Sequence, residues 1–133
     1  MRYALLNLLA CPMCKHFPLE LKVFESVKEK RKFSVESPFC DTYCAYLRKP
    51  VKELKTPPPC EECLETEVKY GVLICPNCGR WYPIIDGIPL MYPDKRRRHP
   101  RVREREVRFV DMFSVKYPEL FQKLLSVYDP RKG

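Results

Sequence analysis

The alternation of apolar and polar residues predicts two neighbouring strands of an antiparallel sheet. Residues 19–23 alternate Leu and Val with Glu and Lys, the period of two that is typical of a half-buried strand. Residues 67–74 alternate in the same way before ending in an apolar run, so we expect this segment to pair with the first strand. The charged residues 28–32 further predict a turn that joins two strands into a hairpin within residues 24–34.

A further pair of strands is predicted around Asp86 and Gly87, the strongest short hairpin signal in the chain. The apolar segments 81–85 and 88–91 flank this dipeptide and would form the two strands. Pro83 and Pro89 lie inside them, and we expect both at edges or bulges because a proline donates no ladder hydrogen bond. Residues 88–91 would then leave an apolar edge exposed, and such an edge needs a partner.

Helices are predicted at the two ends of the chain. Residues 4–10 are apolar except for Asn7, and a short helix that is apolar nearly all round must be covered. Apolar residues recur at helical spacing over 102–113 and again over 118–127. We expect these two helices to cap the chain's own core, with binding to a partner as the alternative.

Two cysteine pairs of the form Cys-Pro-x-Cys predict a metal site. The two intervening residues let both thiolates of a pair reach one ion, and Gly79 follows the second pair where the backbone must turn with a positive φ. One such pair alone would fit a redox dithiol, and structural disulfides or unreactive buried thiols are further alternatives. Two matched pairs beside apolar segments favour a four-thiolate zinc ribbon. The predicted ligands are Cys11, Cys14, Cys75 and Cys78.

The segment between these pairs contains a second set of four cysteines. Ser37 and Pro38 are typical of a helix start, and we expect a helix over 39–49 that ends before Pro50. Cys40 and Cys44 are four residues apart and would share one face of that helix. A second zinc site is the favoured interpretation, and disulfides or free thiols are the alternatives. The predicted second set is Cys40, Cys44, Cys60 and Cys63.

Length and charge narrow the function classes. The 133 residues are one domain by size with a modest core, and no apolar run approaches the length of a membrane span, so we expect a soluble cytoplasmic protein. The sequence contains no glycine-rich loop and no acid–base pair beside a nucleophile, so we do not expect an enzyme. Much of the formal charge of +8 lies in residues 95–103. This segment would be either a surface that faces RNA or a solvated tail. The candidate phosphate contacts are Lys95, Arg96, Arg97, Arg98, Arg101 and Arg103.

The chain resembles a known family in two segments. An apolar Leu-rich opening precedes Cys11-Pro-Met-Cys14, and Cys75-Pro-Asn-Cys78 precedes the run Gly-Arg-Trp-Tyr-Pro-Ile-Ile-Asp-Gly-Ile-Pro-Leu-Met. Both segments are similar to the small zinc-binding activator subunit shared by several methyltransferases of the translation apparatus. The resemblance covers residues 1–26 and 66–93, and neither the cysteine-containing insert nor the basic extension after Pro93 matches it.

The resemblance implies a non-catalytic partner of S-adenosylmethionine-dependent methyltransferases that modify tRNA, rRNA or a translation release factor. Such a subunit forms a heterodimer in which it covers an apolar face of the enzyme and adds a strand to its central sheet. Carried over to this chain, the docking residues are an N-terminal helix face and the apolar edge strand: Leu5, Leu8, Leu9, Ile88, Pro89, Leu90 and Met91.

The sequence therefore predicts a small α+β zinc ribbon with a short N-terminal helix and an antiparallel sheet. Residues 1–26 and 66–93 would form the ribbon, 27–65 a partly helical cysteine-rich insert, and 94–133 a basic helical extension. One zinc ion is expected, with a second if the insert also binds metal. The alternative function is a zinc-ribbon RNA-binding protein of the translation or transcription machinery, which would use residues 95–103 on phosphates.

Overall fold

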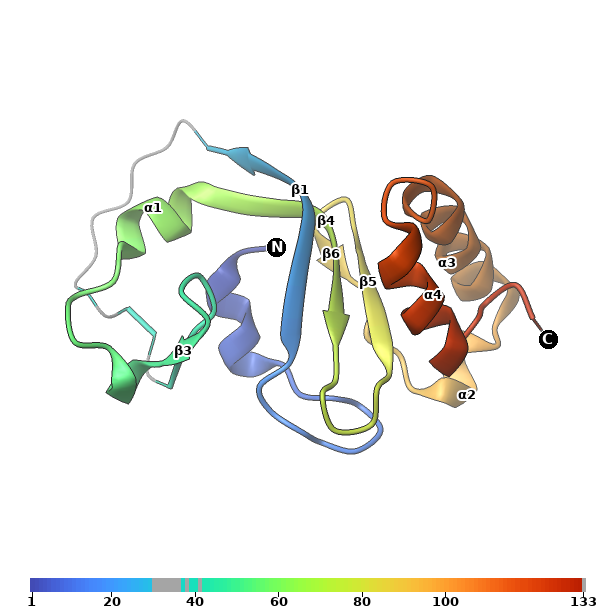
Figure 1. Ribbon diagram of the computed structural model, residues 1–133, viewed down its shortest axis with the longest axis horizontal. Coiled ribbons are helices and arrows are strands. Elements are labelled where there is room, and N and C mark those ends of the chain that lie inside the picture. The colour runs from blue at the N-terminus through green and yellow to red at the C-terminus, as the bar shows by residue number, and fades with distance from the viewer. Residues whose placement is uncertain (30–36, 38, 41, 133) are drawn as a thin grey trace.

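A four-stranded antiparallel sheet lies at the centre of the computed structural model, which describes residues 1–29, 37, 39–40 and 42–132. Its order is β1 (Glu20–Lys28), β4 (Thr66–Ile74), β5 (Trp81–Ile85) and β6 (Ile88–Pro89), as Figure 1 shows. The pairing predicted for segments 19–23 and 67–74 is confirmed by the antiparallel ladder of β1 and β4. The hairpin turn predicted at residues 28–32 lies largely outside the described residues.

Gly71 allows β1 and β4 to approach closely. It pairs with Val23, and a Cβ at position 71 would lie 2.5 Å from the carbonyl oxygen of Lys22. The register shifts just beyond this point, between Val23 and Ser26, which is the mark of a bulge. Only glycine fits this approach without moving the backbone of the neighbouring strand.

The hairpin predicted at Asp86 and Gly87 is confirmed. Both residues have positive φ, 50° and 82°, as a two-residue type I′ turn requires, and they join β5 to β6. As expected, Pro89 lies in the edge strand β6. Pro83 pairs with Val72 of β4 on one side, but on the other side β6 ends before it reaches Pro83, so Pro83 also lies at a local edge. Its carbonyl accepts from the Leu90 N–H at 2.8 Å, so the missing donor of Pro83 faces the side where β6 has already ended.

The two faces of the sheet are covered by different parts of the chain. Trp81 and Tyr82 are neighbours in β5, so their side chains point to opposite faces. Tyr82 joins a core with Leu73, Ile84 and the N-terminal segment, whereas Trp81 joins a second core with the C-terminal helices. The sheet therefore separates two hydrophobic clusters.

A short 3₁₀ helix, η1 (Tyr3–Leu8), covers the first face. The sequence predicts a helix over 4–10, and the structure ends it two residues earlier. The Met1 amino group donates to the Val68 carbonyl at 2.8 Å, and the Val68 N–H donates to the Met1 carbonyl at 2.7 Å. These bonds attach the N-terminus to β4, and Leu6 is buried beneath it.

The C-terminal helices cover the second face, on the opposite side of the sheet from η1 (Figure 1). They are α2 (Asp94–Arg97), α3 (Pro100–Phe113) and α4 (Pro118–Val127). The two longer helices span the segments in which the apolar spacing predicts helices. Phe109 and Phe121 pack against Trp81, whose indole N–H donates to the Tyr128 carbonyl at 3.0 Å.

The helix predicted over 39–49 is wrong. The described residues of this segment form a small hairpin of β2 (Tyr43–Cys44) and β3 (Lys49–Pro50), followed by the 3₁₀ helix η2 (Val51–Glu53) and by α1 (Cys60–Glu65). The Asn7 side chain explains the difference, since it accepts from the Tyr43 N–H at 2.9 Å and donates to the Tyr43 carbonyl at 2.8 Å. These tertiary bonds occupy the backbone groups that a helix would need.

Candidate metal centre and interaction surfaces

Two cysteine pairs meet in space at one end of the sheet. The four Sγ atoms of Cys11, Cys14, Cys75 and Cys78 all lie within 4.8 Å of one another, as predicted. Cys11 Sγ lies 3.6 Å from Cys78 Sγ, and Cys14 Sγ lies 3.4 Å from Cys75 Sγ. The site joins the turn after η1 to the turn between β4 and β5, two segments far apart in the chain.

Each pair is shaped by the same backbone turn. The Lys15 N–H donates to the Cys11 carbonyl, and the Gly79 N–H donates to the Cys75 carbonyl, both at 2.8 Å. Lys15 and Gly79 follow the second cysteine of their pairs and have φ of 65° and 79°. The positive φ predicted for Gly79 is confirmed, and the first pair uses a lysine at the equivalent position.

The sulfur distances fit a tetrahedral zinc ion better than disulfides. Four thiolates at Zn–S distances of about 2.3 Å would stand roughly 3.8 Å apart. The observed distances of 3.4 and 3.6 Å are near this value and far beyond the ~2.0 Å of a disulfide bond. The four side chains therefore form a closed thiolate set of the kind that binds structural zinc.

The site has a buried side and a more open side. Cys11 and Cys75 are buried, and burial raises the pKa of Cys75 to about 12. Cys14 is less buried, and a hydrogen bond with the Asn77 side chain is the main cause that lowers its pKa to about 6. The Tyr82 hydroxyl lies 3.4 Å from Cys11 Sγ, and burial raises the pKa of Tyr82, so the phenol stays protonated beside the sulfur. Tyr82 thus links the metal centre to the first core.

The second cysteine set lies together in the insert, but more loosely. Among the described residues, its four Sγ atoms do not all come within 4.8 Å of one another. Cys60 Sγ accepts from the Phe39 N–H at 3.3 Å, which places Phe39 beside the start of α1. Burial is the main cause that raises the pKa of Cys63 to about 12, and the three neighbouring cysteines of the set raise it further. A second zinc site remains a prediction.

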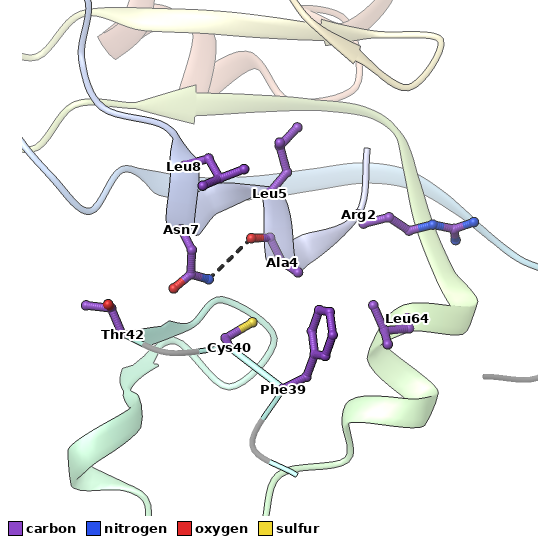
Figure 2. A pocket seen from close by; sticks show the side chains of 9 residues that line it. All are labelled: Arg2, Ala4, Leu5, Asn7, Leu8, Phe39, Cys40, Thr42 and Leu64. Carbon is purple, nitrogen blue, oxygen red and sulfur yellow. Dashed lines mark hydrogen bonds between the residues drawn. The ribbon is translucent and has the colours of Figure 1, made fainter. Parts of the chain in front are cut away.

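The predicted docking residues have different exposures. Leu8 is 81% exposed and Ile88 is 56% exposed, whereas Leu90 is only 4% exposed and belongs to the folded core. Leu5 and Leu8 line a pocket of about 630 Å³ between η1 and the insert, opposite Phe39 and Leu64 (Figure 2). Leu9, Pro89 and Met91 are half-buried. Leu8 and Ile88 are therefore the two most accessible members of the set.

The edge of the sheet at β6 offers backbone groups as well as side chains. Because the Leu90 N–H points toward β5, the Pro89 carbonyl and the Met91 N–H point away from it. The N-terminus lies beside this hairpin, since a Cβ at position 87 would lie 3.2 Å from the Met1 nitrogen. The start of η1 and the β5–β6 turn are thus close neighbours.

The basic segment 95–103 does not form one exposed strip. Arg97 is only 1% exposed, so the expectation that it contacts RNA from an open surface is wrong. It pairs with Glu106, with Arg97 Nε 2.8 Å from Glu106 Oε2. Arg103 is half-buried and donates to the Pro130 carbonyl, whereas the remaining candidates are exposed: Lys95, Arg96, Arg98 and Arg101.

Two contacts of the C-terminal extension escaped the sequence reasoning. The guanidinium of Arg97 lies over the ring of Tyr128, 3.9 Å from its centroid, and close to Trp81. Arg80, two residues after Cys78, forms a two-pronged ion pair with Asp94 at the start of α2. Both pairs join residues distant in sequence, so no local pattern could identify them. Within the described part of the chain, no helix is long and apolar enough to cross a membrane.

Comparison with known proteins gives two matches. A family model described as "Trm112p-like protein" matches residues 2–87, a range that includes the insert and stops before α2. The chain is similar to the multifunctional methyltransferase subunit trm112 of Schizosaccharomyces pombe, with 57% identity over 28 residues. This match covers 21% of the chain and 22% of that protein, so the chain spans about a fifth of the relative's length.

Proposed function

Because the chain belongs to the Trm112p-like family, we propose that it is the non-catalytic activating subunit of S-adenosylmethionine-dependent methyltransferases. In this proposal the partners modify tRNA, rRNA or a translation release factor in the cytoplasm. The single observation that carries the docking part is the edge of the sheet at β6, where Ile88 is exposed and the Pro89 carbonyl points outward. The name of the fission-yeast relative supports a partner of this class.

The zinc centre would act as a scaffold rather than as a catalyst. Four thiolates complete a tetrahedron and leave no position for a water or substrate. When bound, zinc would fix the two cysteine pairs relative to each other. The residues Cys11, Cys14, Cys75 and Cys78 would hold it, while the hydroxyl of Tyr82 orients the Cys11 sulfur from inside the core.

Docking would combine strand addition with burial of apolar side chains. The outward Pro89 carbonyl and Met91 N–H would bond to an exposed strand of the enzyme, which provides affinity through the main chain. Ile88 and Leu8 would enter apolar pockets of the partner and provide specificity. An exposed apolar edge in a folded protein is an aggregation hazard, and a permanent partner removes it.

Binding measured with a co-expressed methyltransferase subunit from the same genome tests this surface. Ile88→Lys and Leu8→Lys each place a charge in a dry interface, so we expect affinity to fall roughly thirtyfold or more. Leu90→Lys would be a poor test because Leu90 is buried in the folded chain.

Val115→Lys is the matched control for this binding measurement. Val115 is 82% exposed and lies between α3 and α4, away from the proposed surface. The control should bind with native affinity and retain native zinc content. Equal affinities for Ile88→Lys and Val115→Lys would refute the proposed docking edge.

A further inference from the structure

A small cavity in the C-terminal extension is lined by basic side chains. Its volume is about 230 Å³, and its walls are formed by Arg97, Arg98, Arg103, Tyr128, Pro130 and Lys132. Four of these residues are cations and none is an acid. The cavity lies outside the range matched by the family model, so nothing in that similarity accounts for it.

Arg97 is the feature that makes this cavity more than a basic patch. Its side chain is almost fully buried, yet its Nη1 atom has no hydrogen-bond partner within the described chain. Buried polar groups are nearly always satisfied, and an unsatisfied donor costs the desolvation energy of that group. The other guanidinium nitrogens bond to Glu106 Oε2, so Nη1 is the one guanidinium nitrogen left without an acceptor.

The surroundings hold Arg97 rigidly in this place. Its guanidinium carbon lies 3.9 Å from the ring centroid of Tyr128, 5.0 Å from that of Tyr82 and 5.3 Å from that of Trp81. The Tyr128 hydroxyl donates to Glu106 Oε1 at 3.3 Å, which fixes the carboxylate as well. A binding group held in this way loses little conformational entropy when a ligand arrives.

The charges of the cavity are only partly compensated. Glu106 offsets the charge of Arg97, and Asp129 is paired with Arg131. Arg103 donates to the carbonyl of Pro130 at 2.8 Å, a neutral acceptor that leaves its charge uncompensated. Neither Arg98 nor Lys132 has an ion pair among the contacts of the described residues. The cavity therefore carries excess positive charge around an unsatisfied N–H donor.

We propose that this cavity binds one phosphate group. Planar guanidinium groups match phosphate oxygens with paired hydrogen bonds, and the arrangement of several arginines around one point is typical of phosphate recognition. The phosphate could belong to a nucleic-acid backbone or be a free anion, and the two sources share this chemistry. Arg98 also lines a neighbouring cavity with Lys95, Arg96 and His99, which would extend the contact along a backbone.

The test uses the zinc-loaded full chain and inorganic phosphate, with binding followed by amide chemical shifts at constant ionic strength. The variant Arg98→Gln, Lys132→Gln removes two lining cations at the cavity and keeps Arg97 and Glu106. We expect it to bind phosphate about tenfold more weakly or worse, because the loss of a single hydrogen bond to a charged group costs at least about that factor. The matched control is Arg105→Gln, Lys123→Gln, which removes the same charge from exposed residues that do not line the cavity.

A second arm separates the two sources of phosphate. If a single-stranded RNA oligonucleotide competes with inorganic phosphate and loses affinity in the cavity variant only, the phosphate belongs to a nucleic acid. If inorganic phosphate binds and the RNA affinity falls equally in both variants, the site takes a free phosphate. Both results support the site. An absence of phosphate binding to the native chain, or equal phosphate affinities of the two variants, would overturn it.

Discussion

Arg97 and Glu106 form an ion pair that is buried between α2 and α3, each side chain only 1% exposed. The pair joins the short helix α2 to α3 and lies directly beneath Tyr128. Burying two charges is costly, and the stability of such a pair depends on both members being present. The pair therefore makes the position of the C-terminal extension sensitive to a single substitution.

Glu106→Ala should lower the free energy of unfolding by about 3–5 kcal/mol, because it leaves the Arg97 charge buried and uncompensated. Glu104→Ala is the matched control, since Glu104 is exposed on the same helix and pairs with Arg108 at the surface. The control should lose about 0.5 kcal/mol or less. Urea unfolding followed by circular dichroism measures both, and equal losses would show that the buried pair has no special role.

Cys75→Ser should remove zinc and the folded state together. Structural zinc contributes about 10–16 kcal/mol in small peptides at neutral pH, which is as large as or larger than the ~5–15 kcal/mol stability of a typical domain. Native mass spectrometry should find zinc in the wild-type chain and none at this site in the variant, whose dispersed amide spectrum should collapse. A reduced native chain that is folded and free of zinc would contradict the assignment.

The insert cysteines make a separate prediction about metal content. If Cys40, Cys44, Cys60 and Cys63 close around a metal, the chain should hold two zinc ions. Cys40→Ser, Cys60→Ser should then hold one and remain folded, because Cys11 and its three partners form an independent site. Alkylation of the unreduced protein distinguishes the alternative, since two disulfides would protect four thiols. One zinc in both proteins would exclude the second site.

Asn7→Ala should loosen the insert without unfolding the sheet. The Asn7 side chain provides both hydrogen bonds to the backbone of Tyr43, and an unsatisfied buried group costs about 1–3 kcal/mol. Hydrogen exchange should therefore accelerate at Tyr43 and at Val51, whose N–H donates to the Thr42 carbonyl in the same hairpin. Exchange at Leu73, which pairs with both β1 and β5, should stay at its native rate. Acceleration at all three positions would indicate global rather than local loss.

Local signals were sufficient for the sheet and for the first metal site. The alternation around Leu21 and Val68, the turn at Asp86 and Gly87 and the spacing of Cys75 and Cys78 each depend on residues adjacent in the chain. Such short-range patterns reflect backbone geometry, and at these positions the tertiary contacts agree with them. The two halves of the metal site could be matched because they share one form.

Long-range contacts explain what the sequence did not predict. The helix expected over 39–49 is absent because Asn7, more than thirty positions away, bonds to Tyr43. In the sequence Arg97 is one cation of a basic run, and nothing local predicts that it is buried. Its burial depends on the ion pair with Glu106 on the next helix. Leu90 follows the exposed Ile88 in the same apolar segment but is covered in the folded chain. Charge and hydropathy give no information on which neighbour will cover a residue.

Methyl transfer from S-adenosylmethionine is the most direct measure of the central claim. A catalytic subunit from the same genome should be weakly active alone, this chain should be inactive alone, and the two together should give several-fold more product. The stimulation should disappear with Ile88→Lys and persist with Val115→Lys. Equal product with and without the native chain, for each methyltransferase that binds it, would contradict the proposed role as an activating subunit.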